Sequence, residues 1–116
     1  MTIRNVTRDT LLAQKAELAD TPLKRVKGLL GRNALARGQA LVIRPCNSVH
    51  MLFMKFAIDV VFVDGQNQVV GLCVNLRPFQ LSPIFWKSAC AIELPAGTID
   101  WTKTGLGDTI NVQTGN

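Results

Sequence analysis

The sequence contains no tyrosine, one histidine and only 6% aromatic residues, and these scarcities limit the sites that it can build. Residues 1–44 contain no Phe, Trp or Tyr, so they lack the stacking platforms that binders of single-stranded nucleic acid normally use. Phosphate-binding loops, dinucleotide-binding glycine patterns, hydrolase elbows and zinc-protease helices are also missing from the sequence. We therefore expect neither a nucleic acid partner nor one of the common catalytic classes.

Long apolar runs are missing as well. The most apolar stretch, residues 49–63, is interrupted by His50, Lys55 and Asp59, and its apolar pieces are far shorter than the roughly 20 residues of a membrane span. The opening sequence "MTIRNVTRDTLLAQ" has no apolar segment of the signal-peptide type. These features predict a cytoplasmic protein with no transmembrane segment.

The three cysteines, Cys46, Cys73 and Cys90, cannot all pair within one chain, so we expect them to be reduced and packed as small apolar residues. This expectation also fits the cytoplasm. The 116 residues are 47% hydrophobic and hold no repeat or low-complexity tract. Length and composition therefore predict a single domain, residues 1–116, with its own hydrophobic core.

Charge is distributed unevenly along the chain. Residues 1–44 carry nine Lys or Arg and only three acidic residues, whereas residues 45–116 carry four basic and five acidic residues. A positive face of this kind attracts anionic partners, such as a small anionic ligand, an acidic protein or a lipid headgroup. A solvated basic surface without a partner is the alternative interpretation.

The segment "DTPLKRVKGLLGR" predicts one short helix over residues 22–31. Thr21 is a suitable N-cap, Pro22 suits the first helical position, and Gly31 suits a left-handed end. Three apolar residues at helical spacing should form its buried stripe: Leu23, Val26 and Leu30. The helix would then present its basic residues at the sides and back of that stripe: Lys24, Arg25 and Lys27.

The rest of the pattern indicates β-structure. In "AIDVVFVDGQNQVVGLCV", two β-branched runs flank residues 64–67, which is typical of a hairpin, and the first strand is apolar on both faces. Weaker runs, "ALVI", "ACAIEL" and "DTINVQ", raise the expected total to five to seven strands. The segment "LLAQKAELA" fits helix or strand equally. The predicted fold is α+β, mainly antiparallel, and barrel-like or a sandwich.

Two carboxylates, Asp59 and Glu93, lie within apolar strand sequences, where an unpartnered charge is costly. Lys55, Arg77 or Arg25 could pair with them. Two interpretations stay open. Both carboxylates could converge with His50 in a cleft, where their pKa values would be perturbed, or they could fix strand register and tie down turns.

Cys46 and His50 raise two further hypotheses. Thiolate and imidazole are preferred zinc ligands, but four ligands are needed and no second closely spaced pair exists, so we predict no metal. The same pair could act as nucleophile and base in a small enzyme, although nothing in the sequence marks an oxyanion hole. Phe85, Trp86 and Trp101 lie in loop-like sequence and could instead form a protein contact or a surface pocket.

The order of five motifs, "TPLKRVKGLLGR", "HMLFMKFAIDVVFVD", "NLRPF", "AIELPAGT" and "GLGDTI", resembles the bacterial and archaeal domain of unknown function family 192, also called uncharacterised protein family 0127. The resemblance covers about residues 12–112. It implies a compact, mostly β domain with a short helix after the first strand, which favours strand for "LLAQKAELA". Many relatives look exported and carry a "FWMKNT"-like version of the central motif, whereas this chain reads "HMLFMKFA", which favours a cytoplasmic branch.

The resemblance transfers no catalytic role. The positions that match the family's motifs are Arg25, Gly28, Arg32, Met54, Lys55, Asp59, Pro78, Glu93, Gly97, Gly107 and Asp108. We therefore expect a non-enzymatic binding or accessory protein with an anion-accepting cleft and no cofactor. The expected binding residues are His50, Lys55, Asp59, Glu93, Arg25 and Arg77. A small enzyme using His50 or Cys46 and a structural subunit of a larger assembly are the alternatives.

Overall fold

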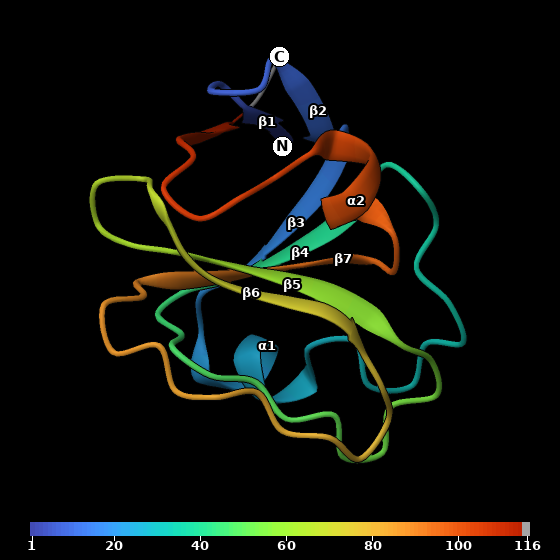
Figure 1. Cartoon of the computed structure of the whole chain (residues 1–116). Helices are drawn as coiled ribbons and strands as arrows, with labels where there is room; N and C mark the ends of the chain where they lie inside the picture. The colour runs from blue at the N-terminus through green and yellow to red at the C-terminus, as the bar shows by residue number, and fades with distance from the viewer. Residues whose placement is uncertain (115–116) are drawn as a thin grey trace.

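The chain folds into two β-sheets and two short helices (Figure 1). The structure, a computed structural model, describes residues 1–114. The elements in chain order are β1 (Thr2–Asn5), β2 (Thr10–Ala13), β3 (Lys15–Ala19), α1 (Pro22–Lys27), β4 (Gln39–Ile43), β5 (Ile58–Val63), β6 (Val69–Leu76), β7 (Cys90–Pro95), α2 (Thr98–Thr102) and β8 (Ile110–Gln113). The predicted α+β fold with mainly antiparallel sheets is confirmed. The sheets do not close into a barrel, and the described residues form eight strands rather than five to seven.

The larger sheet has five strands in the order β3-β4-β7-β5-β6. Only β3 and β4 pair in parallel, and the other neighbours are antiparallel. All residues of β5 and β7 are buried, because these strands lie inside the sheet and both of its faces are covered. The sequence prediction of a strand covered on both sides, followed by a hairpin to β6, is therefore confirmed.

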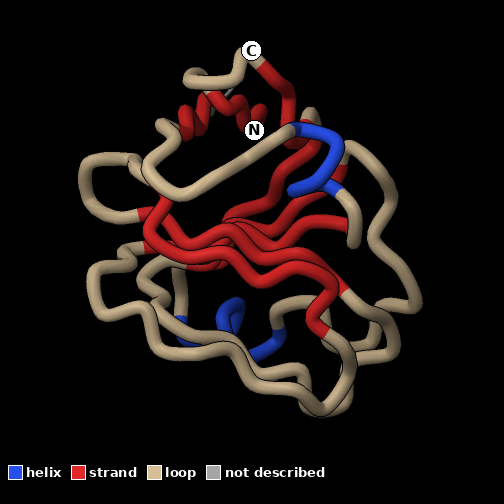
Figure 2. The backbone as a smooth tube through the Cα atoms, viewed as in Figure 1, coloured by secondary structure: helices blue, strands red, loops and turns tan. Residues whose placement is uncertain are grey.

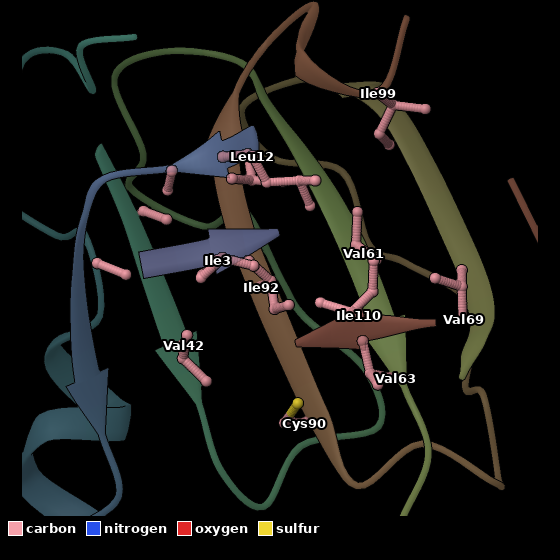
Figure 3. Packing of buried hydrophobic residues seen from close by; sticks show 14 residues of the cluster. Ile3, Leu12, Val42, Val61, Val63, Val69, Cys90, Ile92, Ile99 and Ile110 are labelled. Atoms are coloured by element: carbon pink, nitrogen blue, oxygen red, sulfur yellow. The ribbon is translucent and has the colours of Figure 1, made fainter. Parts of the chain in front are cut away.

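One face of this sheet packs against the smaller sheet, which has the order β2-β1-β8. Figure 3 shows side chains from both sheets meeting in this core, with Ile3 and Ile110 opposite Ile92 and Val61. Burial of branched aliphatic side chains here supplies a large part of the favourable free energy of folding. Helix α2 lies at the same side of the larger sheet (Figure 1).

The opposite face carries a second hydrophobic core, which is covered differently. Figure 2 shows that loops and the short α1 lie on this side, with no second sheet. Phe62 from β5 packs there against Phe85 of a loop, with ring centroids 4.6 Å apart. Of the three aromatic residues expected in loops, Phe85 therefore belongs to a core and Trp86 is exposed. Trp101 lies in α2 instead of a loop, and it stacks under the Arg37 guanidinium.

Helix α1 begins as predicted but ends early. Thr21 Oγ1 accepts a hydrogen bond from the Lys24 N–H at 3.3 Å, so the N-cap is confirmed. The helix ends at Lys27, because Gly28 adopts a positive φ of 46° three residues before the predicted stop. The predicted buried stripe is wrong: the helix buries no residue, and Leu23 and Val26 are 85% and 74% exposed.

Two further segments differ from the residue-based expectations. "LLAQKAELA" contributes to two strands, β2 and β3, which agrees with the strand implied by the family resemblance. Helix α2 was not predicted, since its five residues are too few for a recognisable apolar period. No helix within residues 1–114 is long and apolar enough to cross a membrane.

Candidate ligand pocket beside helix α1

A pocket of about 430 Å³ lies between α1 and the face of the larger sheet that loops cover. Its volume falls in the range of roughly 300–1,000 Å³ that is typical of small-molecule sites. The helix contributes its inner side, the chain from Pro45 to His50 contributes a second wall, and Glu93 of β7 reaches it from the sheet. The apolar residues that line it are Pro22, Val26, Leu29, Leu30, Ile43, Pro45, Val49 and Met54.

The local sequence explains why a cavity forms here. Helix α1 has only six residues and buries none of them, so it stands beside the sheet instead of packing flat on it. The turn after α1 then places Leu29 in the core, and the loop after β4 brings in Val49 and Met54. These apolar side chains make the wall of the pocket continuous with the second core.

Glu93 is the buried acidic group of this pocket. It lies on β7 beside Leu41 of β4 and Val60 of β5, and only 6% of its surface is exposed. Within residues 1–114 its carboxyl group has neither a hydrogen bond nor an ion pair. Burial raises the pKa of Glu93 to about 7, and the positive charge of Arg32 opposes that rise.

Arg25 supplies the pocket with positive charge from α1. Its Nη1 donates a long hydrogen bond of 3.4 Å to the carbonyl oxygen of Pro45. Its Nε is buried and has no hydrogen-bond partner among the described residues. A guanidinium group carries five N–H donors, so Arg25 retains donors for a further acceptor.

Cys46 lines the same pocket as these two charged groups. Burial raises the pKa of its thiol, the charge of Glu93 raises it further, and the charge of Arg25 acts in the opposite direction. The Cys46 thiol donates a hydrogen bond to the carbonyl oxygen of Ser48 at 3.0 Å. Burial therefore favours a protonated thiol at neutral pH, which makes Cys46 a poor nucleophile.

Asp59 does not belong to this pocket, so the expected single cleft containing both Asp59 and Glu93 is wrong. In strand β5 the side chains of Asp59, Val61 and Val63 alternate with those that face the second core, which places Asp59 on the other face of the sheet. Its carboxylate accepts three backbone N–H hydrogen bonds, from Asn75 at 2.8 Å, Gly97 at 3.1 Å and Ile99 at 2.9 Å. This geometry matches the alternative interpretation, a carboxylate that ties down turns.

The other expected binding residues are dispersed. His50 lies exposed at the pocket wall, in a β-bridge with Leu81. Lys55 is exposed and its Nζ lies 3.5 Å from Asn33 Oδ1, while Arg77 is exposed and does not line the pocket. The structure thus brings together Arg25, His50 and Glu93, and separates them from Lys55, Asp59 and Arg77.

Two features of the pocket escaped the sequence analysis. Arg32 influences Glu93, although it pairs on the surface with Glu17 at 2.9 Å. The apolar wall formed by Leu29, Val49 and Met54 also had no recognisable signal, because such residues look like ordinary core. Within residues 1–114, no group of three or more His, Cys, Asp or Glu side chains is arranged to hold a metal ion.

Comparison with known proteins places this fold in a group without assigned activity. The family model DUF192, described as an uncharacterized ACR, matches residues 3–112. A UPF0127 protein of Thermococcus sibiricus is 31% identical over 92% of this chain and 71% of its own length. A UPF0127 protein of Pyrococcus furiosus is 34% identical over 90% of this chain and 91% of its own length. Both relatives are archaeal, so they give no support to a bacterial source for this chain.

A solved structure has the same fold. A protein of unknown function from Novosphingobium aromaticivorans superposes with a TM-score of 0.82, covering 96% of this chain and 82% of that protein. The sequence identity is 20%, so this likeness concerns the fold alone.

Proposed function

The chain belongs to the DUF192 family, and from that premise we propose that it is a non-enzymatic binding protein whose pocket beside α1 accepts a small organic acid. The observation that carries this proposal is the Arg25 guanidinium, which lines the pocket with a buried Nε that has no partner among residues 1–114. An unsatisfied buried donor costs about 1–3 kcal/mol, and a ligand carboxylate or phosphate would remove that cost.

The charge around the pocket supports the same ligand class. Lys27 lines the pocket together with Arg25 on the same short helix. The remaining wall is largely apolar, which suits a ligand with a hydrocarbon body and one acidic group. The excess of basic residues in residues 1–44 would also draw anions toward this side.

The test is a binding screen of the purified chain against organic acids and sugar phosphates, followed by heteronuclear NMR. We expect the ligand to shift the amide signals of Gly28, Cys46 and Val49, which line the pocket. Arg25→Gln should weaken binding at least tenfold. Lys24→Gln is the matched control, because it removes the same charge from the same helix but does not line the pocket. Equal affinity in both variants, or no acid that binds, would contradict the proposal.

A role as a subunit in a larger assembly is a second candidate. Trp86 is 79% exposed, and Phe53 and Phe79 form an exposed edge-to-face pair with centroids 6.4 Å apart. Exposed aromatic residues are typical of protein contacts. Sedimentation of the wild type and of a Trp86→Ser variant tests this role, which predicts self-association or co-purification that the substitution abolishes. The remaining alternative, a small enzyme using Cys46 or His50, gains no support from the protonated Cys46 thiol.

We further propose that the chain is one domain in the cytoplasm. Both hydrophobic cores use the same five-stranded sheet, which supports the first statement. All three cysteines are free, and Cys73 and Cys90 are buried, as a reducing compartment would leave them.

A further inference from the structure

The pocket beside α1 is lined by a cationic and an acidic side chain. The Nε of Arg25 is buried without a hydrogen-bond partner among residues 1–114. Glu93 is only 6% exposed, and within those residues its carboxyl group forms no ion pair and accepts no hydrogen bond. Buried carboxyl groups are normally hydrogen-bonded, and in this fold Asp59 and Asp108 each accept three hydrogen bonds. Glu93 therefore differs from the other buried acidic side chains, because it lacks hydrogen-bond donors among the described residues and it lines the pocket.

The two groups come from different elements that line the pocket, and Cys46 lines it as well. Arg25 sits on α1 next to Pro45, whereas Glu93 lies on β7 in the sheet. No ion pair joins Arg25 to Glu93 among the described residues, so neither side chain satisfies the other and both line a pocket that can receive a ligand.

A simple anion does not complement this arrangement. Its acidic group would be satisfied by Arg25, but Glu93 would remain without a donor and would repel the anion whenever it is ionised. A simple amine would satisfy Glu93 and leave Arg25 unpartnered. A ligand with an amino group and a carboxylate would satisfy both.

We propose that the pocket binds a small amino-carboxylate with an apolar body, a free apolar amino acid or a dipeptide, with its amino group on Glu93 and its carboxylate on Arg25. This inference rests on the proposed function and adds the second polar contact to it. The apolar body would lie against Leu29, Val49 and Met54, and the volume of about 430 Å³ accommodates either size of ligand.

The experiment uses calorimetry with the full chain and two sets of probes. The first set is L-leucine, 4-methylpentanoate and L-leucinamide, and the second is leucyl-leucine, its N-acetyl derivative and its C-terminal amide. The acids in each set lack the ammonium group, and the amides lack the carboxylate. We expect at least one zwitterion to bind tenfold or more tightly than both of its analogues.

Two variants assign the contacts. Glu93→Gln should weaken binding of the zwitterion and the amide at least tenfold, whereas it should tighten binding of the acid, because it removes the charge that repels the anion. Arg25→Gln should weaken binding of the zwitterion and the acid and leave the amide unchanged, while Lys24→Gln should change none of them. If Glu93→Gln does not fold, the comparison of the three probes on the wild type still decides the question.

Two negative results are distinguishable. If an acid without an amino group binds as tightly as its zwitterion and still depends on Arg25, the organic-acid site stands and the amino-carboxylate inference is wrong. If none of the probes binds and no other organic acid binds either, both proposals are wrong.

Discussion

Asp59 and Glu93 lie on neighbouring strands of one sheet, and both are almost completely buried, yet they face opposite sides of that sheet. Asp59 accepts three backbone hydrogen bonds, whereas Glu93 accepts none from residues 1–114. Burial alone does not distinguish a structural carboxylate from a candidate ligand contact. The difference lies in whether the backbone provides donors at that position.

The two sides of the sheet explain this contrast. On the Asp59 side, the bulge near Asn75 and the start of α2 turn backbone N–H groups toward the carboxylate. On the Glu93 side, loops and a helix without buried residues leave a pocket, and no backbone donor reaches the carboxyl group. The first arrangement stabilises the fold, and the second leaves an acceptor available.

The largest expected effect of a substitution is that of Asp59→Asn. An amide has one oxygen acceptor and points an NH₂ group at a backbone N–H, so at least one of the three buried donors is left unsatisfied. We expect the free energy of unfolding to fall by about 4 kcal/mol. Urea denaturation followed by circular dichroism measures this change.

Asp64 provides the matched control for that variant. Its Oδ1 alone accepts from the N–H groups of Gln66 and Gln68 in the exposed hairpin loop, and the amide oxygen of an asparagine can replace it. Asp64→Asn should therefore cost less than about 1 kcal/mol. A similar loss at both positions would mean that the buried contacts of Asp59 have no special role.

In contrast to Asp59→Asn, Glu93→Gln should increase the free energy of unfolding at alkaline pH. In the unfolded chain the Glu93 carboxyl has its ordinary pKa of about 4.5, and burial raises the pKa in the folded state to about 7. Between these values the folded state binds more protons, so the free energy of unfolding of the wild type falls as the pH rises from 4.5 through 7. Glutamine cannot ionise, and we expect the variant to be more stable at pH 8 by up to about 3 kcal/mol.

The comparison is made as a difference between wild type and Glu93→Gln at each pH, so that other titrating groups cancel. Arg32, which opposes the rise in the Glu93 pKa, must stay unchanged, and Cys46 is the other titratable group whose pKa responds to Glu93. The two stabilities should converge near pH 4.5. A difference that is constant from pH 4.5 to 8 would show that Glu93 is not desolvated.

Asp108 is a third buried carboxylate and, like Asp59, it accepts hydrogen bonds. We expect its substitution to have a smaller effect than that of Asp59. Burial favours its neutral form, but hydrogen bonds from Asn5, Gly105 and Arg8, with the charge of Arg8, outweigh burial and lower the pKa of Asp108. The stabilisation is therefore complete above the unfolded value of about 3.8 and is lost as the pH falls through the lower folded value. We expect Asp108→Asn to cost about 2 kcal/mol at pH 7, with the difference from wild type shrinking below pH 3.8.

Much of the fold follows from local patterns. The β5–β6 hairpin has two β-branched runs around a loop of turn-forming residues, and β5 has apolar residues on both faces, so both features were predicted correctly. Helix α1 was misjudged because Gly28 and Gly31 are equally good stop signals in sequence. Which of them ends the helix depends on how the following turn places Leu29 in the core.

The candidate site was less predictable for a geometric reason. Sequence identified Asp59 and Glu93 as buried carboxylates, but their faces depend on the strand register that pairs Val60 with Glu93. A shift of one residue between β5 and β7 would place Asp59 opposite Glu93, with both side chains on the same face of the sheet. Nor could the sequence indicate that three backbone donors converge on Asp59, since Asn75 lies in β6, and Gly97 and Ile99 lie at the start of α2.

The smallest expected change in the free energy of unfolding is for a substitution in α1. This helix lines the pocket but buries no residue. Leu23 is 85% exposed, so Leu23→Ala should change the free energy of unfolding by less than about 0.5 kcal/mol. Leu29→Ala, just beyond the helix and 2% exposed, should cost about 3 kcal/mol in the same denaturation experiment. A large loss in Leu23→Ala would mean that α1 packs against the protein in solution and that the space beside it is closed. The small loss of stability that we predict would mean that Leu29 and the loop carrying Val49, and not α1, hold the pocket wall in place. A ligand could then reach Glu93 beside a helix that is not packed against the sheet.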